Sequence, residues 1–297
     1  MRAEVPHAEA ILALRPAPVS SPAWDKSAAG WNQHAAPIRA WLQHATTAML
    51  DAAGIAAGSR VLDIAAGAGD QTLDIARRTG PQGYVLATDI SANALALAQA
   101  NLRAAGCAQL DTRLADAQAL GLAGAGFDAA VCRLGLMFCA QPGDALDGVR
   151  QALQPGGRFS ALVFSQPGRN PCLGIMMACA LQHAGLPARQ PFEPGTLLSL
   201  GQPGLLAQLL RDAGFLNIDV RPVAAPFHMP TSRHYVDFVR TSGSPIMELL
   251  ASLPAPAQAA AWDDMASRLE VFTTPAGWVG PNELLLCGAT APGVPNH

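Results

Sequence analysis

Three aspartates stand at regular intervals in the first half of the chain. Asp63, Asp89 and Asp116 lie 26 and 27 residues apart, and each interrupts or ends a short apolar run. Apolar runs that alternate with helical stretches are typical of parallel strands. The carboxyl ends of parallel strands meet at one edge of a sheet, where open α/β sheets bind ligands. Singly, each acid could cap a helix or face solvent; together they predict three polar anchors along one binding edge.

A turn of small residues follows the first acid. The stretch Arg60–Asp70, RVLDIAAGAGD, passes from an apolar run into five residues without bulk at 65–69, and a helix-forming stretch begins at Asp70. A ligand can approach such a backbone closely, and the free N–H groups of the first helical turn point toward it. The alternative for this stretch alone is a buried strand, turn and helix with no ligand.

The three acids help to choose among nucleotide ligands. A glycine-rich turn also suits NAD or FAD, but Thr72 occupies the place of the third glycine in G-x-G-x-x-G. A carboxylate at Asp63 is poorly placed beside a pyrophosphate and suits a cationic group, such as the ammonium of an amino acid. Asp89 ends the next strand, where a carboxylate takes ribose hydroxyls, and Asp116 lies within reach of a purine edge. The pattern therefore predicts an adenosine joined to an amino acid.

The surrounding elements are predicted to form a doubly wound α/β sheet. Strands are expected at 61–64, 83–89, 109–116, 127–133 and 158–164, with helices at 70–78, 93–105 and 142–154. One or two amphipathic helices are expected at 24–50, which either pack on the core or cover a pocket. After residue 165 the sequence predicts a sixth strand at 215–223, mainly helix at 229–269 and a final strand at 283–289.

Composition limits the class of protein. With 50% hydrophobic residues, 14% charged residues and a net charge of −3, the chain can build a large core and has no basic footprint for nucleic acid. Its six cysteines form no C-x-x-C pair and show no zinc spacing, so no metal is expected. The acidic residues Glu4 and Glu9 and the lack of a long apolar run predict a cytoplasmic protein without a membrane span.

Five segments, read in order, resemble a known family. VLDIAAGAGD, ATDIS, LADAQAL, FDAAVCRLGLMF and LQPGGRFSALVF look like motifs of class I S-adenosylmethionine-dependent methyltransferases, over roughly residues 24–165. AAGAGD and the upstream WDKSAAGWN resemble the ubiquinone/menaquinone C-methyltransferase branch. The resemblance implies an α/β, Rossmann-like sheet of seven strands in the order 3-2-1-4-5-7-6, with an N-terminal helical cap and a helical insertion at 224–282 before the last strand.

The resemblance also implies which residues bind S-adenosylmethionine. The methionine part would lie against the turn, the ribose at the second strand, and the adenine between the second and third strands. The only departure from the wider family pattern is Ala65, where glycine is usual and where the quinone-type branch often has alanine. The implied cofactor-binding residues are Trp31, Asp63, Ala65, Gly67, Gly69, Gln71, Thr72, Asp89, Ile90, Asp116, Ala117 and Arg133.

Candidate catalytic residues are fewer. Arg133 follows the fourth strand, and the resemblance places it close to the sulfonium; a salt bridge at the sheet edge is its alternative role. An oxygen or carbon acceptor can also need a base, for which we favour His228 or His234 beside a proline-containing turn. Either histidine could instead be structural. Candidates outside the cofactor motifs are His183, Glu193, His228, His234, Tyr235 and Asp237.

Together these features predict methyl transfer to O or C of a small aromatic or hydrophobic acceptor. After the fourth strand, Arg133-Leu134-Gly135-Leu136 replaces the Asn/Asp-Pro-Pro-aromatic motif of amine and adenine methyltransferases. The alternative is a cofactor-binding protein without transferase activity, and the oligomeric state is open between monomer and homodimer. The expected division is a flexible leader at 1–22, a cap at 23–55, the cofactor core at 56–165 and an acceptor-covering part at 166–292. The expected acceptor pocket contains Trp24, Trp31, Met137, Phe138, Phe192, Phe227, Tyr235 and Phe238.

Overall fold

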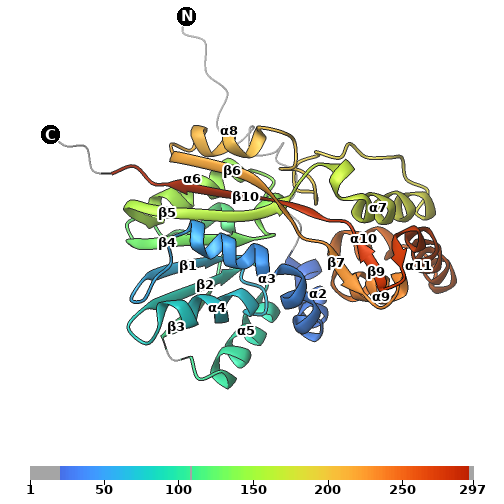
Figure 1. Cartoon of the computed structure of the whole chain (residues 1–297), viewed down its shortest axis with the longest axis horizontal. Helices are drawn as coiled ribbons and strands as arrows, with labels where there is room; N and C mark the ends of the chain where they lie inside the picture. The colour runs from blue at the N-terminus through green and yellow to red at the C-terminus, as the bar shows by residue number, and fades with distance from the viewer. Residues whose placement is uncertain (1–20, 108, 294–297) are drawn as a thin grey trace, which may run out of the picture.

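A mixed sheet, mainly parallel, runs through the centre of the computed structural model, which describes residues 21–107 and 109–293. Its seven strands lie in the order β3-β2-β1-β4-β5-β10-β6 (Figure 1). β10 pairs antiparallel with both β5 and β6, whereas β1 pairs parallel with β2 and β4. Since β10 is the seventh strand of this sheet along the chain, the predicted order is confirmed. The strands are β1 (Arg60–Ile64), β2 (Tyr84–Asp89), β3 (Leu110–Leu114), β4 (Phe127–Arg133), β5 (Leu153–Phe164), β6 (Leu216–Ala224) and β10 (Glu283–Thr290).

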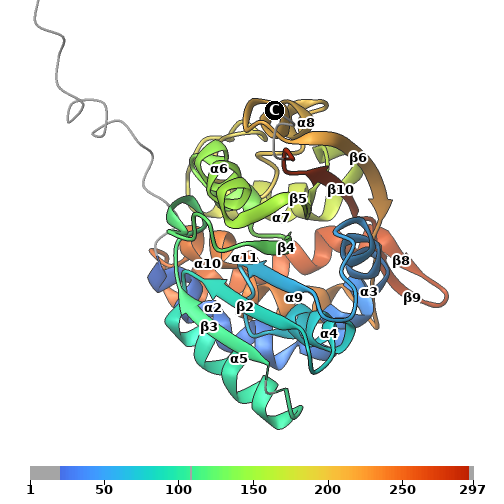
Figure 2. The ribbon, with the colours of Figure 1, turned by 90° about the vertical axis from the view of Figure 1, so that its left-hand side faces the viewer.

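Helices cover both faces of this sheet. Figure 2 shows α3 and α4 on one side and α6 on the other. The central strands are buried on both faces, and every residue of β1 after Arg60 is buried, which explains why this run is apolar except for Asp63. The helices that accompany the sheet are α3 (Ala35–Ala52), α4 (Asp70–Thr79), α5 (Ala92–Ala104), α6 (Pro142–Ala152) and α8 (Leu205–Asp212).

A second group of elements lies beyond the carboxyl ends of the parallel strands (Figure 1). We call it the helical lobe; it consists of α7, α9, α10, α11 and a small antiparallel sheet in the order β7-β9-β8. The N-terminal helix α2 (Ser21–Gln33) packs against both α5 and α9, so it joins the lobe to the main sheet. The lobe elements are α7 (Pro171–His183), β7 (Phe227–Met229), α9 (Ser232–Ser242), α10 (Ser244–Leu250), α11 (Ala255–Leu269), β8 (Thr273–Thr274) and β9 (Gly277–Gly280).

Several boundaries differ from those expected. The fifth strand was expected at 158–164, but β5 begins at Leu153 and shifts register against β4 before Arg158. Asp116 lies beyond β3 and caps the short 3₁₀ helix η1 (Ala117–Ala119). The expected leader, residues 1–22, lies outside the described residues except for its last two, with which α2 begins. In the part of the chain that the structure describes, no helix has the length and apolarity needed to cross a bilayer.

Candidate active site

The turn after β1 has an unusual backbone. Ala65, Gly67 and Gly69 all have positive φ, at 54°, 57° and 85°. A Cβ atom built on Gly67 would meet no atom within 4 Å, whereas one on Gly69 would lie 3.1 Å from the Cβ of Ala98. Glycine at 67 therefore leaves the backbone bare beside open space, and glycine at 69 permits close packing of α5. This is a cradle for a ligand at the N-terminus of α4.

Asp63 does not face this open space, which corrects the expected contact with a cationic ligand group. Its carboxylate is fully buried and accepts hydrogen bonds from the Gln71 amide and, at 2.6 Å, from the Thr72 hydroxyl. Burial raises the pKa of Asp63 to about 6, against the opposing effect of these two hydrogen bonds. The hydrogen bonds of Asp63 thus hold the start of α4. Of Asp63, Gln71 and Thr72, only Gln71 borders the cavity described below.

Asp89 connects the turn to the neighbouring strand end. Its Oδ2 accepts a hydrogen bond from the Gly67 N–H at 2.9 Å, and its Oδ1 accepts one from the Ser91 N–H at 2.8 Å. Burial raises the pKa of Asp89, while those backbone N–H groups lower it. Each carboxylate oxygen keeps a further lone pair for a ligand hydroxyl. Asp116 lies farther along the same edge, where its Oδ1 accepts from the Gln118 N–H at 2.9 Å.

Arg133 forms the salt bridge that the sequence offered as its alternative role. It borders the same cavity, and its Nη2 lies 2.9 Å from Oδ2 of Asp70, while its Nη1 donates to the Thr46 hydroxyl at 3.0 Å. Asp70 also pairs with Arg39, at 2.6 Å. The Arg133 side chain is only 8% exposed, so the ion pair with Asp70 fixes this guanidinium in the cavity wall.

One cavity of about 720 Å³ is bordered by Asp89, Asp116 and Arg133 and by aromatic side chains of α2, α3 and the helical lobe. Trp24 meets Phe138 edge to face, with ring centres 4.8 Å apart. The ring centres of Trp41 and Phe227 are 4.7 Å apart. Of the expected acceptor residues, only Phe192 is not among those bordering the cavity. Sequence reasoning missed several bordering residues, namely Arg39, Trp41, Phe164, Leu173, Met176 and Asn282.

The structure brings together most of the expected cofactor residues. Trp31, Ala65, Gly67, Gln71, Asp89, Ile90, Asp116, Ala117 and Arg133 border the cavity, whereas Asp63, Gly69 and Thr72 lie behind it.

The structure does not bring His228 or His234 to this cavity. His228 lies on β7 with an exposed side chain, because Phe227, its neighbour in the strand, takes the buried face. His234 is exposed on α9, and its Nδ1 is hydrogen-bonded to the Thr231 hydroxyl at 2.8 Å. Neither residue borders the cavity, so we do not carry a general-base role forward for them.

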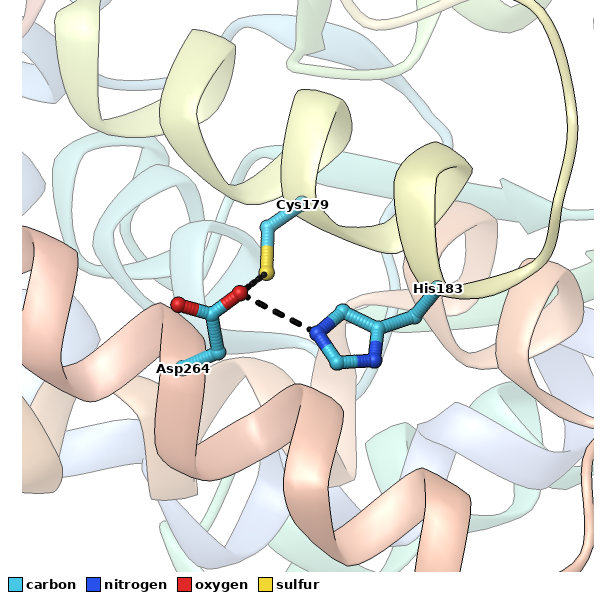
Figure 3. A group of neighbouring side chains, drawn as sticks. All are labelled: Cys179, His183 and Asp264. Atoms are coloured by element: carbon cyan, nitrogen blue, oxygen red, sulfur yellow. Dashed lines mark hydrogen bonds and ion pairs between the residues drawn. The ribbon is translucent and has the colours of Figure 1, made fainter.

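A polar cluster joins α7 to α11 in the helical lobe (Figure 3). Oδ2 of Asp264 accepts a hydrogen bond from the Cys179 thiol at 3.3 Å and pairs with Nε2 of His183 at 3.1 Å. Arg268 donates to both oxygens of the same carboxylate, at 2.9 and 2.8 Å, and lowers the pKa of Asp264 to about 2. A metal ion at Oδ2 would have to displace this guanidinium. We therefore interpret the cluster as a tether that holds α7 over the cavity.

Comparison with known proteins agrees with this geometry. Residues 61–157 match a family model described as a methyltransferase domain. This match and the sheet topology support a methyltransferase domain of the class I, S-adenosylmethionine-dependent type in this part of the chain. The ubiquinone/menaquinone biosynthesis C-methyltransferase UbiE of Ectopseudomonas mendocina is 38% identical to this chain over 125 residues, 42% of this chain and 48% of that protein. The corresponding Pseudomonas fluorescens protein is 35% identical over 119 residues, 40% of this chain and 46% of that protein.

The chain also has solved structural neighbours. The [4+2]-cyclase SpnF has a TM-score of 0.55 and 21% identity, over 84% of this chain and 80% of that one. Phosphoethanolamine N-methyltransferase 2 of Haemonchus contortus, in complex with S-adenosylmethionine, has a TM-score of 0.54 and 15% identity, over 88% of this chain and 57% of that one. At these identities the similarity shows the fold alone. The chain spans about half the length of the curated relatives that it matches.

Proposed function

We propose that the chain transfers a methyl group from S-adenosylmethionine to carbon or oxygen of a small aromatic acceptor. The observation that carries this proposal is the single cavity of about 720 Å³. One part of it is bordered by the Gly67 turn, Asp89 and Asp116, and the other by aromatic rings of α2, α3 and the helical lobe. A nucleoside-binding edge that opens directly into an apolar chamber suits a reaction between a bound cofactor and an apolar molecule.

The residues present fit the cofactor. The bare backbone at Gly67 leaves room for the methionine part beside Gln71, which Asp63 holds in place. Asp89 has lone pairs available for both ribose hydroxyls, and we assign Asp116 to accept from the adenine amino group. In this proposal residues 56–165 hold the cofactor, while residues 23–55 and 166–292 cover the acceptor.

The protein's contribution to the reaction is mainly positioning. The sulfonium of the cofactor supplies the methyl group, and an in-line displacement requires donor and acceptor atoms to be aligned at close range. Asp70 and Thr46 hold the Arg133 guanidinium in the cavity wall. The aromatic walls exclude water and orient a flat molecule by ring stacking.

The names of the curated relatives favour carbon as the receiving atom, and the proposal keeps oxygen open. The test incubates the full chain with S-adenosylmethionine carrying a labelled methyl group and a panel of phenols and hydroquinones. We expect label in an organic product together with an equal amount of S-adenosylhomocysteine, and resistance of the label to ether cleavage identifies methylation on carbon. Cofactor binding without product on any acceptor would instead support a cofactor-binding protein that does not transfer methyl groups.

A further inference from the structure

Tyr235 carries a hydroxyl group without a protein partner beside the cavity. The residue lies in the first turn of α9, borders the cavity and is only 3% exposed. Its hydroxyl makes no hydrogen bond with any residue that the structure describes. Buried tyrosine hydroxyls usually find a partner, so an unpaired one at a cavity indicates a partner in the molecule that binds there.

The Tyr235 oxygen is accessible rather than enclosed. In the described part of the chain, the side-chain nitrogen and oxygen atoms that are both enclosed and unpaired are Nε of Arg150 and Oδ1 of Asn282. The unpaired Tyr235 oxygen is not one of these atoms, so it keeps accessible surface. Because the side chain is buried among aromatic rings and borders the cavity, this surface opens into the cavity.

Neighbouring rings fix the direction of this hydroxyl. The Tyr235 ring stacks on Trp278, with ring centres 4.7 Å apart, and meets Phe227 edge to face at 5.3 Å. Trp278 is fully buried, and its indole N–H donates to the Leu269 carbonyl at 2.7 Å, so this stacking partner is itself held in place. A tyrosine side chain has only two χ angles, so the hydroxyl is preorganised for a ligand atom.

Two other donors in the same wall are already used inside the protein. The Trp41 indole N–H donates to the Ala225 carbonyl at 2.7 Å, and the Trp31 indole N–H donates to the Ser242 carbonyl at 2.9 Å. An aromatic molecule in the chamber therefore meets these two indoles as apolar surfaces. The Tyr235 hydroxyl, in contrast, still has its proton to offer.

Burial decides how this hydroxyl acts. It raises the pKa of Tyr235, and Cys172 makes a smaller contribution in the same direction. The hydroxyl therefore stays protonated at neutral pH and is unsuited to the role of general base, for which the sequence made Tyr235 a candidate. A neutral phenol in an apolar wall instead donates a hydrogen bond to an oxygen atom of its ligand.

We infer that the Tyr235 hydroxyl donates a hydrogen bond to an oxygen atom of the methyl acceptor, so that the chamber selects aromatic molecules carrying a hydroxyl or carbonyl group. This inference rests on the proposed function, because it assigns the chamber to the acceptor. It names the substrate class as oxygen-bearing aromatic compounds and makes Tyr235 a specificity-determining residue. Before the acceptor binds, water in the cavity can take the place of that oxygen.

The test compares ligand binding by the wild type and by Y235F, which lacks only the hydroxyl. Equilibrium dialysis on the full chain saturated with S-adenosylhomocysteine measures the affinities for 2-naphthol and for 2-methylnaphthalene, which has a methyl group in place of the hydroxyl. Y235F should bind 2-naphthol about fivefold more weakly, as one neutral hydrogen bond predicts, and should bind 2-methylnaphthalene as the wild type does. Y84F is the matched control and should leave both affinities unchanged, because Tyr84 does not border the cavity and its hydroxyl donates to Asp111.

An unchanged affinity of Y235F for 2-naphthol, or an equal loss for both compounds, would overturn the inference. Y235F should also keep the unfolding free energy of the wild type, and a large loss of stability would overturn the inference by showing that the hydroxyl is paired inside the fold. The methyl-transfer assay is run on the same samples. Weaker 2-naphthol binding by Y235F without any methyl transfer would contradict the proposed function and keep the inference, whereas methyl transfer with unchanged 2-naphthol binding would do the reverse.

Discussion

The amide of Gly67 donates a hydrogen bond to the Asp89 carboxylate, with 2.9 Å between N and Oδ2. This contact fixes the turn after β1 to the end of β2, two segments that are 22 residues apart. The turn and the carboxylate therefore keep a constant separation, which the methionine and ribose parts of one cofactor must match. Preorganisation of this kind reduces the entropy lost on binding.

Replacing Asp89 by alanine should weaken cofactor binding. The variant loses the acceptor for the ribose hydroxyls and frees the Gly67 amide, so we expect a loss of about 1–3 kcal/mol in binding free energy. Calorimetric titration with S-adenosylhomocysteine measures it. Asp147, half exposed on α6, provides the control variant D147N, which should bind as the wild type does. Equal affinity of D89A and D147N would remove Asp89 from the cofactor site.

Replacing Gly67 by valine should abolish cofactor binding by filling the cradle. Gly58 is a matched control, because both glycines have positive φ, 57° and 82°, and a Cβ atom added to either would meet no atom within 4 Å. Both G67V and G58V should lose about 1–2 kcal/mol of stability from the strained backbone. Only G67V should lose affinity for S-adenosylhomocysteine, whereas a similar loss in both variants would show that strain alone is responsible.

Asp63 should make stability depend on pH. Its pKa is raised from 3.8 to about 6 in the folded protein, so between these values the folded state holds more protons than the unfolded state. The unfolding free energy contributed by this group therefore falls as pH rises from about 4 to 6, by up to about 3 kcal/mol. Urea unfolding of the wild type and D63N at several pH values isolates this contribution. A difference between the two proteins that is constant over this range would contradict the assignment.

Removing the Arg133 side chain should destabilise the fold. R133M removes one of the two guanidinium partners of the Asp70 carboxylate in the wall of the cavity. We therefore expect a loss of about 3 kcal/mol in the free energy of unfolding. R233M breaks the exposed pair between Arg233 and Asp263 and serves as the control, with little expected change. If denaturant midpoints fell equally in both variants, burial of the Arg133 pair would have no special effect.

The central strands and the binding edge could be predicted from the sequence because they depend on local patterns, whereas the strand order was implied by the family resemblance. Apolar runs followed by an acid recur with each strand and helix, and Asp89 and Asp116 lie along the predicted edge, although Asp116 is two residues beyond β3. The face taken by Asp63 was not predictable, since β1 is buried on both sides and its pattern does not distinguish them. The strands β7, β8 and β9 have only two to four residues each, too few for a periodic signal.

Residues of the helical lobe were hardest to place. His228 and His234 have side chains suited to proton transfer, but their direction depends on the pairing of β7 with β9, which joins residues about 50 positions apart. Asn282 carries no motif at all. Its place at the border of the cavity follows from tertiary packing and cannot be derived from residue spacing.

The most direct test of the cofactor site is a crystal structure of the chain with S-adenosylhomocysteine. We expect the ribose hydroxyls within hydrogen-bond distance of the Asp89 carboxylate, the adenine amino group beside Asp116, and the sulfur atom facing the aromatic chamber. A ligand bound elsewhere, or one whose ribose makes no contact with Asp89, would contradict the proposed methyl transfer at this edge of the sheet.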